Sequence, residues 1–241
     1  MSLLNMRLLR KSLVSFVLAG GFLAGVSAHA MTRNAVEMVC PYDGVKFTFN
    51  DQMSGTSFDK RLDWMPVGAI ESPWPLAACP TNGFVFLKEK YDADELERLR
   101  PLILSAEYQG LKGETPYYRA AWIKERTGAP HPEVSRWLLQ ATWQATGEQY
   151  SRYATELVAR LSVDIADKTE SAEQHIGYRL LTGEILRRLG RFEEADGQFV
   201  ALTKDLEPAS NEAKIVAFQR RLIADKDIRA HLISEALGKS R

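Results

Sequence analysis

Two different spacings of apolar residues divide the chain. Val45, Phe47 and Phe49 alternate with polar residues, and this period of two predicts a strand that carries the three side chains on one face. A second aromatic-rich run, Phe84–Leu87, also has the pattern of a short strand. The first part of the chain is therefore predicted to contain β-structure.

The segment between these two runs is rich in residues that interrupt regular structure. Residues 51–75 contain five glycine or proline residues, and we expect a long loop there without a strong helix. We place the rings of Trp64 and Trp74 over a small core, because a module of about sixty residues buries little apolar surface by itself. This module is expected to run from residue 31 to residue 90.

Apolar residues recur at helical spacing from Asp92 onward, where glycine mainly separates the apolar runs. We expect Pro101 to end or kink the first helix. The expected helices open at residues 92–95 and then cover 117–127, 132–146, a stretch around 153–161, two helices within 176–206, and the segments 211–224 and 228–237.

The two helices within 176–206 have the spacing of a tetratricopeptide repeat. Small Gly183 and Ala195 would let them approach closely, Gly190 would form the turn, and a phenylalanine, Phe199, would fill the space between them. One such repeat cannot bury its own apolar face, so neighbouring helices are expected to stack on it as a short solenoid. The alternative is an irregular helical bundle. We predict an α+β, mostly α fold, with a small β-containing N-terminal module followed by a tetratricopeptide-like solenoid over residues 91–241.

The first thirty residues predict export. Arg7, Arg10 and Lys11 precede an apolar run, 13–26, and small residues stand before an expected cleavage after Ala30. A membrane anchor is the alternative, but a spanning helix needs roughly 20 residues. We therefore expect a periplasmic or secreted protein, with no stable membrane insertion after residues 1–30 are removed.

The charge balance gives no indication of nucleic acid binding. The chain has 31 basic and 31 acidic residues, and removal of residues 1–30 takes away three basic ones, which leaves a net charge of −3. The remaining lysines and arginines alternate with acids along the chain, whereas binding to phosphates needs a basic stripe. We expect no nucleic acid partner.

A five-residue pattern is present twice, as Cys40-Pro-Tyr-Asp-Gly44 and Cys79-Pro-Thr-Asn-Gly83. Together with Leu186-Arg-Arg-Leu-Gly190, it resembles an uncharacterised bacterial family that joins a Cys-Pro-x-Cys-Gly zinc-ribbon-like module to tetratricopeptide-like helices. The resemblance implies a fold but no known activity. This chain departs from the pattern because Asp43 and Asn82 stand at the second ligand positions.

The resemblance implies that the two knuckles face each other, so that Cys40 and Cys79 lie close enough to form a disulfide. An oxidising compartment and an even number of cysteines favour this pairing. Two alternatives stay open: a redox-active pair, although no Cys-x-x-Cys motif is present, and a metal site formed by Cys40, Asp43 and Cys79.

The sequence contains no recognisable catalytic constellation and indicates no cofactor. His131, His175 and His231 are more than forty residues apart and have no partner at metal-ligand spacing. Motifs for a serine nucleophile, a phosphate loop or a dinucleotide are also absent from the sequence. We expect neither catalytic nor metal-binding residues, and lean against an enzyme.

Binding of a protein or peptide is the function that this pattern favours. In the expected repeat register, Glu184, Arg187 and Arg188 lie on or near the concave face, where arginine could clamp a carboxylate. The alternative is that both arginines form ion pairs with Glu184 and Glu194. We predict a non-enzymatic scaffold or adaptor with the disulfide module as a cap. The alternatives are a thiol- or metal-handling factor centred on the cysteines and a self-assembling envelope component.

Overall fold

The computed structural model describes residues 31–239; the predicted signal peptide, residues 1–30, lies outside this range. Strand β1 (Thr32–Val39) pairs antiparallel with β2 (Lys46–Ser54), and the first cysteine knuckle forms the turn between them. The predicted alternation in β2 is confirmed, since Phe47 and Phe49 are half-buried between exposed neighbours. A second hairpin pairs β3 (Thr56–Lys60) with β4 (Pro66–Ala69).

The prediction of a long loop over residues 51–75 is wrong, because this segment contains the end of β2 and the second hairpin. Two of its glycine and proline residues, Gly68 and Pro66, allow β3 and β4 to pair. A Cβ atom on Gly68 would lie 2.1 Å from the carbonyl oxygen of Thr56 on the opposite strand, so only glycine fits there. Pro66 occupies the first position of β4, where proline is tolerated.

The second expected strand is not formed. Among residues 84–87, Val85 makes an isolated bridge to Ala78, and the N–H of Phe86 donates to the carbonyl of Ala77 over 2.9 Å. Phe84 and Val85 are fully buried. The apolar run is therefore a short buried segment that lies against residues 77–79 through a single bridge.

The helical part confirms most of the expected segments. The helix over 211–224 has the predicted bounds, whereas the one predicted over 228–237 is reduced to its last turn, and a short helix over 106–109 was not expected. Pro101 lies inside the first helix, which ends two residues later. The helices are α1 Ala93–Ile103, α2 Ala106–Gln109, α3 Pro116–Arg126, α4 His131–Gln144, α5 Gly147–Ala166, α6 Ala172–Arg188, α7 Phe192–Thr203, α8 Asn211–Ala224 and α9 Ile233–Leu237.

The α6–α7 pair has the packing that the repeat pattern predicts. A Cβ atom on Gly183 would lie 2.3 Å from the ring of Phe199, so the close approach of the two helices depends on this glycine. Gly190 forms the turn with φ +74°, and Ala195 and Phe199 are fully buried. Each helix from α3 to α9 packs against the next along the chain, which is the arrangement of a solenoid. The α+β, mostly α fold class is confirmed.

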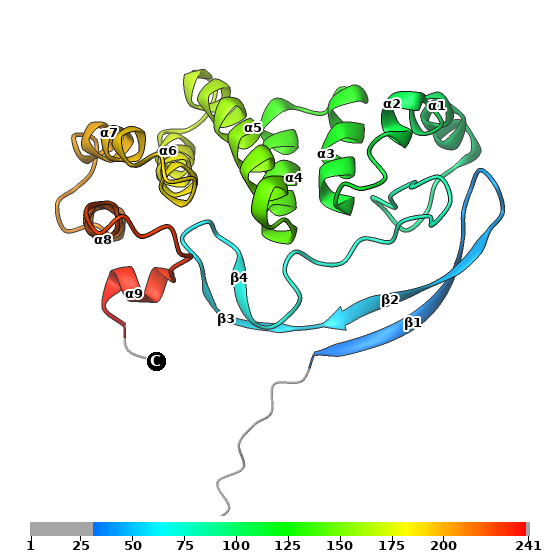
Figure 1. Cartoon of the computed structure of the whole chain (residues 1–241), viewed down its shortest axis with the longest axis horizontal. Coiled ribbons are helices and arrows are strands. Elements are labelled where there is room, and N and C mark those ends of the chain that lie inside the picture. The colour runs from blue at the N-terminus through cyan, green and yellow to red at the C-terminus, as the bar shows by residue number, and fades with distance from the viewer. Residues whose placement is uncertain (1–30, 240–241) are drawn as a thin grey trace, which may run out of the picture.

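The strands run along the row of helices as one curved ribbon (residues 32–69), which Figure 1 shows below the helices, from the α1–α2 end to α9. The expectation that the β module only caps one end is therefore wrong. Trp64 belongs to a different cluster from the cysteines. Its ring packs on α6, 3.4 Å from the position that a Cβ atom on Gly177 would take. Trp74 is 42% exposed, so it does not cover a core either.

Two buried clusters fix the ribbon and the following loop to the helices. One surrounds Cys40, Cys79 and Phe84 with side chains of α1 to α3. The other, centred on α4 to α6, includes Trp64 and Leu76 at its edge. The reason for the shape is that a two-stranded ribbon has no core of its own and must bury its apolar face against another layer.

Candidate functional site

The two cysteine knuckles adopt the same backbone turn. In each, the glycine N–H donates to the cysteine carbonyl over 3.0 Å. The cysteine N–H donates to the carbonyl of the residue after the glycine, over 2.9 Å in the first knuckle and 2.8 Å in the second. Gly44 and Gly83 have φ of +70° and +73°, a region that favours glycine. Cys40 and Cys79 form a disulfide with their Cα atoms 5.6 Å apart, so the predicted pairing is confirmed.

Asp43 links the two knuckles a second time. Its carboxylate accepts hydrogen bonds from the Thr81 hydroxyl and, over 3.0 Å, from the side-chain amide of Asn82. These bonds, that from Thr81 foremost, lower the pKa of Asp43. Asp43 and Asn82, which stand at corresponding positions of the two knuckles, therefore bind each other. Within residues 31–239 no group of three or more His, Cys, Asp or Glu could hold a metal ion.

The second knuckle is anchored in the helical part through the Gly83 carbonyl. This oxygen accepts from the Tyr108 hydroxyl of α2 over 2.7 Å and from the Arg119 guanidinium of α3 over 2.8 Å. Burial raises the pKa of Tyr108 to about 12, so the hydroxyl keeps its proton for this bond. Cys40 and Cys79 are both buried, and their position inside a packed wall supports a structural role.

The three residues predicted to line a groove lie inside the molecule. Glu184 and Arg187 have no exposed surface, and their side chains form a paired, two-bond contact at 2.7 and 2.9 Å. Arg187 also donates to the backbone carbonyls of Asp227 and, over 2.9 Å, Arg229 in the segment between α8 and α9. These contacts leave neither side chain free to meet a ligand, so we look for the binding surface elsewhere.

Arg188 has a different partner from the one expected. It pairs over 2.5 Å with the buried carboxylate of Asp63, which lies in the turn between β3 and β4. Glu194 pairs with Arg191 instead, also over 2.5 Å. The ion-pair alternative is thus confirmed for Arg187 with Glu184, as a buried pair, but not for Glu194. The Arg188 pair joins the ribbon to α6.

Asp63 is the centre of a buried charge cluster. Arg61 donates to its carboxylate over 2.9 Å. Arg188, which pairs with Asp63, is also surrounded by Glu184, Arg187 and the ring of Tyr150. Burial raises the pKa of Glu184 to about 7, against the opposing effect of Arg187. The cluster holds the far end of the ribbon, where the N–H of Leu62 also donates to the carbonyl of His231 over 2.9 Å.

One histidine, serine and aspartate meet at α4 and α5 without forming a nucleophile. Asp164 is buried and accepts from the Ser135 hydroxyl over 2.6 Å, while His131 Nδ1 lies 2.6 Å from its other oxygen. Both partners contact the carboxylate, whereas activation of a serine needs a direct contact from serine to histidine. We assign this group to the packing of α4 against α5.

The ribbon side of the helices is covered by the chain itself. Besides the Trp64 contact with α6, the Tyr117 hydroxyl of α3 donates to the Trp74 carbonyl over 2.8 Å. Leu76 packs on the same helical core. These residues therefore cover the concave helical surface that the repeat pattern predicts. An open surface lies beyond them, at the ribbon.

That surface is a hollow of about 490 Å³ between the ribbon and the segments that follow it, here called the ribbon groove. Val36 stands opposite Phe49, and Met38 opposite Phe47, so these residues share the inner face of the first hairpin. The groove is lined by Val36, Met38, Phe49, Asp51, Trp74, Pro75, Leu76, Ala77, Phe86, Leu87, Lys88 and Glu89.

Sequence reasoning identified the Phe49 side of this groove but not its β1 side. Val36 and Met38 are separated only by Glu37 and are flanked by the apolar Ala35 and Val39, so the period of two is too short to be a strong strand signal. The signal was available in the knuckle, because a five-residue turn between two extended segments predicts a hairpin and so places β1 opposite β2. No protein-family model, curated protein or solved structure matches the chain.

None of the helices within residues 31–239 has both the length and the apolar character that crossing a membrane requires.

Proposed function

We propose that the chain is an exported, periplasmic or secreted, non-enzymatic scaffold or adaptor that holds an extended segment of a partner protein in the ribbon groove. The observation that carries the proposal is the groove itself. Apolar side chains from β1, β2 and the following loop line it together, and the half-exposed Trp74 stands among them. Aromatic side chains with this exposure are enriched where proteins bind other proteins.

The chemistry of the lining suits a peptide. Val36, Met38 and Phe49 offer an apolar wall to side chains, and Asp51, Lys88 and Glu89 at the groove offer charged groups to peptide N–H and C=O groups. A volume of about 490 Å³ accommodates a few side chains, so one short segment of a partner would fill it. The thiol- or metal-handling alternative receives less support, because both sulfurs are buried in a disulfide.

The experiment places a photo-crosslinking amino acid at position 74 in the exported full-length protein and, as a control, at Val163. Val163 is 55% exposed and lies on α5, away from the groove. We expect a crosslinked partner from position 74 that is not obtained from position 163. Substitution of Met38→Asp should reduce crosslinking from position 74 by about tenfold, because a charge in the apolar wall disfavours apolar side chains.

Equal adducts from both positions, or no adduct from position 74, would contradict the proposal. Circular dichroism of Met38→Asp distinguishes lost binding from lost folding. If that variant unfolds, Trp74→Ala serves as the second test, with the photo-crosslinking amino acid moved to the exposed Glu89 of the same groove, since a half-exposed ring can be removed without opening the core.

A further inference from the structure

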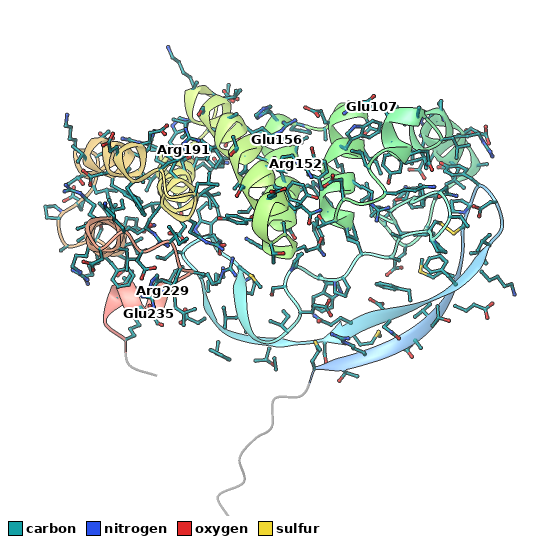
Figure 2. All side chains as sticks on the ribbon, in the orientation of Figure 1. Glu107, Arg152, Glu156, Arg191, Arg229 and Glu235 are labelled. Atoms are coloured by element: carbon teal, nitrogen blue, oxygen red, sulfur yellow. A yellow bond between two sulfur atoms is a disulfide. The ribbon has the colours of Figure 1, made fainter. Side chains whose placement is uncertain are left out.

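A second hollow lies between α1 and the end of α3. Two adjoining cavities of about 580 and 380 Å³ share Tyr91, Glu95, Leu99 and Thr127 and so form one continuous groove, the α1–α3 groove. Arg126 at its rim pairs with Glu107, which Figure 2 places at the edge of the row opposite the ribbon. The α1–α3 groove adjoins the ribbon groove at Leu87 and Lys88, which line both, and extends from there along α1 and α3.

The floor of this groove is apolar and its rim is cationic. Leu99 and Leu102 of α1 face Ile123 of α3 across the floor. Four basic side chains line the groove together with a single acid, Glu95; they are Lys88, Arg98, Lys124 and Arg126. Glu95 binds Lys88 and the N–H of Asp92. Both contacts lower the pKa of Glu95, and the contact with Lys88 has the larger effect. The charge of this acid is therefore already neutralised within the chain.

Aromatic rings hold three of the cations in place. The guanidinium carbon of Arg126 lies 3.8 Å from the ring centre of Trp122, Lys88 lies 5.0 Å from that of Tyr91, and Lys124 lies 5.9 Å from that of a third ring, Trp137. Cations fixed in this way lose little side-chain freedom when they bind an anion. The groove thus presents ordered positive charge beside an apolar floor.

The charges are available to an incoming acid. Arg98 is exposed and forms no ion pair with any residue of the described range 31–239. The partners of the others, Glu107 for Arg126 and Glu133 for Lys124, are surface acids, and such pairs contribute only about 0–1 kcal/mol. A ligand carboxylate can therefore replace them at little cost.

We propose that the α1–α3 groove binds an acidic amphipathic segment of a partner protein, with leucine-like side chains on Leu99, Leu102 and Ile123 and carboxylates on Arg98 and Arg126. Charge complementarity selects this occupant: the lining has four basic groups and one neutralised acid. The volume of the two cavities is enough for several side chains of one helix or turn.

The test measures fluorescence anisotropy of a fluorescein-labelled twelve-residue peptide of leucine and glutamate at helical spacing, titrated with the full-length mature protein at low salt. The matched control peptide has glutamine in place of each glutamate. We expect the acidic peptide to bind at least about tenfold more tightly, and the preference to decrease with added salt.

Variants assign the binding to this groove. Combined Arg98→Glu and Arg126→Glu should weaken binding of the acidic peptide by about tenfold or more, because carboxylates then face carboxylates. Arg136→Glu on α4 makes the charge change of each single substitution at an exposed site and should leave binding within about twofold, whereas Arg98→Glu alone should weaken it. If the double variant does not fold, Arg98→Gln removes the one unpaired charge and should still weaken binding.

Equal binding of the two peptides, no binding of the acidic peptide, or an equal effect of Arg136→Glu would overturn the proposal. The ribbon groove is tested separately, since Trp74→Ala should leave binding of this peptide unchanged. Stronger binding to phosphatidylglycerol vesicles than to the peptide would also overturn it, because the site would then recognise a membrane surface.

Discussion

At the scale of single residues, the sequence and the structure assign opposite roles to the same side chains. Glu184, Arg187 and Arg188 have the composition of a carboxylate-binding site, but in the structure they neutralise each other and Asp63 in the interior. Sequence spacing places residues on one face of a helix, and it does not show whether another segment covers that face. Here Arg188 is covered by a segment more than a hundred positions earlier in the chain, and Arg187 by the segment at residues 227–229.

Burial of Glu184 makes stability depend on pH in an unusual direction. Its pKa is raised from 4.5 to about 7, so the folded state binds more protons than the unfolded state between these values. The contribution of Glu184 to the free energy of unfolding is therefore fully present below pH 4.5 and is lost as pH rises through 7. The slope can reach about 1.4 kcal/mol per pH unit.

Urea unfolding at several pH values between 5 and 8 measures this slope. Glu184→Gln should remove it, because glutamine does not titrate, whereas Glu194→Gln at the exposed Arg191 pair should leave it unchanged. Comparison of variants cancels the contributions of all other titrating groups. An unchanged pH profile in Glu184→Gln would show that Glu184 is ionised in both states.

At the scale of elements, two helical glycines have opposite expected effects. Gly183→Ala should destabilise the protein by about 1–3 kcal/mol, because the added Cβ would overlap the Phe199 ring at 2.3 Å. Gly197→Ala in α7 should stabilise it by about 0.5–1 kcal/mol, since no atom lies within 4 Å of the new Cβ and alanine favours helix. Thermal unfolding of both variants tests the α6–α7 packing; a similar shift in both would refute it.

The accuracy of the sequence predictions also varies with the element. Helices α3, α4, α6, α7 and α8 were predictable because their apolar residues repeat over several turns and their ends carry caps or glycine. The second hairpin was missed, because Gly55, Pro66 and Gly68 break a local pattern although they permit close pairing of two strands. The ribbon groove and the Asp63 cluster arise from contacts between distant segments, which no local period encodes.

At the scale of the whole molecule, the disulfide fixes one end of the ribbon to the helices. It closes a loop with a sequence separation of 39, for which chain entropy gives about 4 kcal/mol of stabilisation. Combined Cys40→Ala and Cys79→Ala should lower the free energy of unfolding by about 2–4 kcal/mol and reduce protection from hydrogen exchange first around the knuckles and α1–α3. Uniform loss of protection over α6–α9 instead would contradict this local effect.

The attachment of the ribbon at both ends of the helical row also orders the folding of the chain. Arg61 pairs with Leu232, and Asp63 pairs with Arg188, so an early segment completes its contacts only with residues made last. During synthesis the end of the ribbon at residues 61–63 remains undocked until residue 232 has been made, and contacts of such long range slow folding. The residues made last therefore decide when the residues made first reach their final position on the helices.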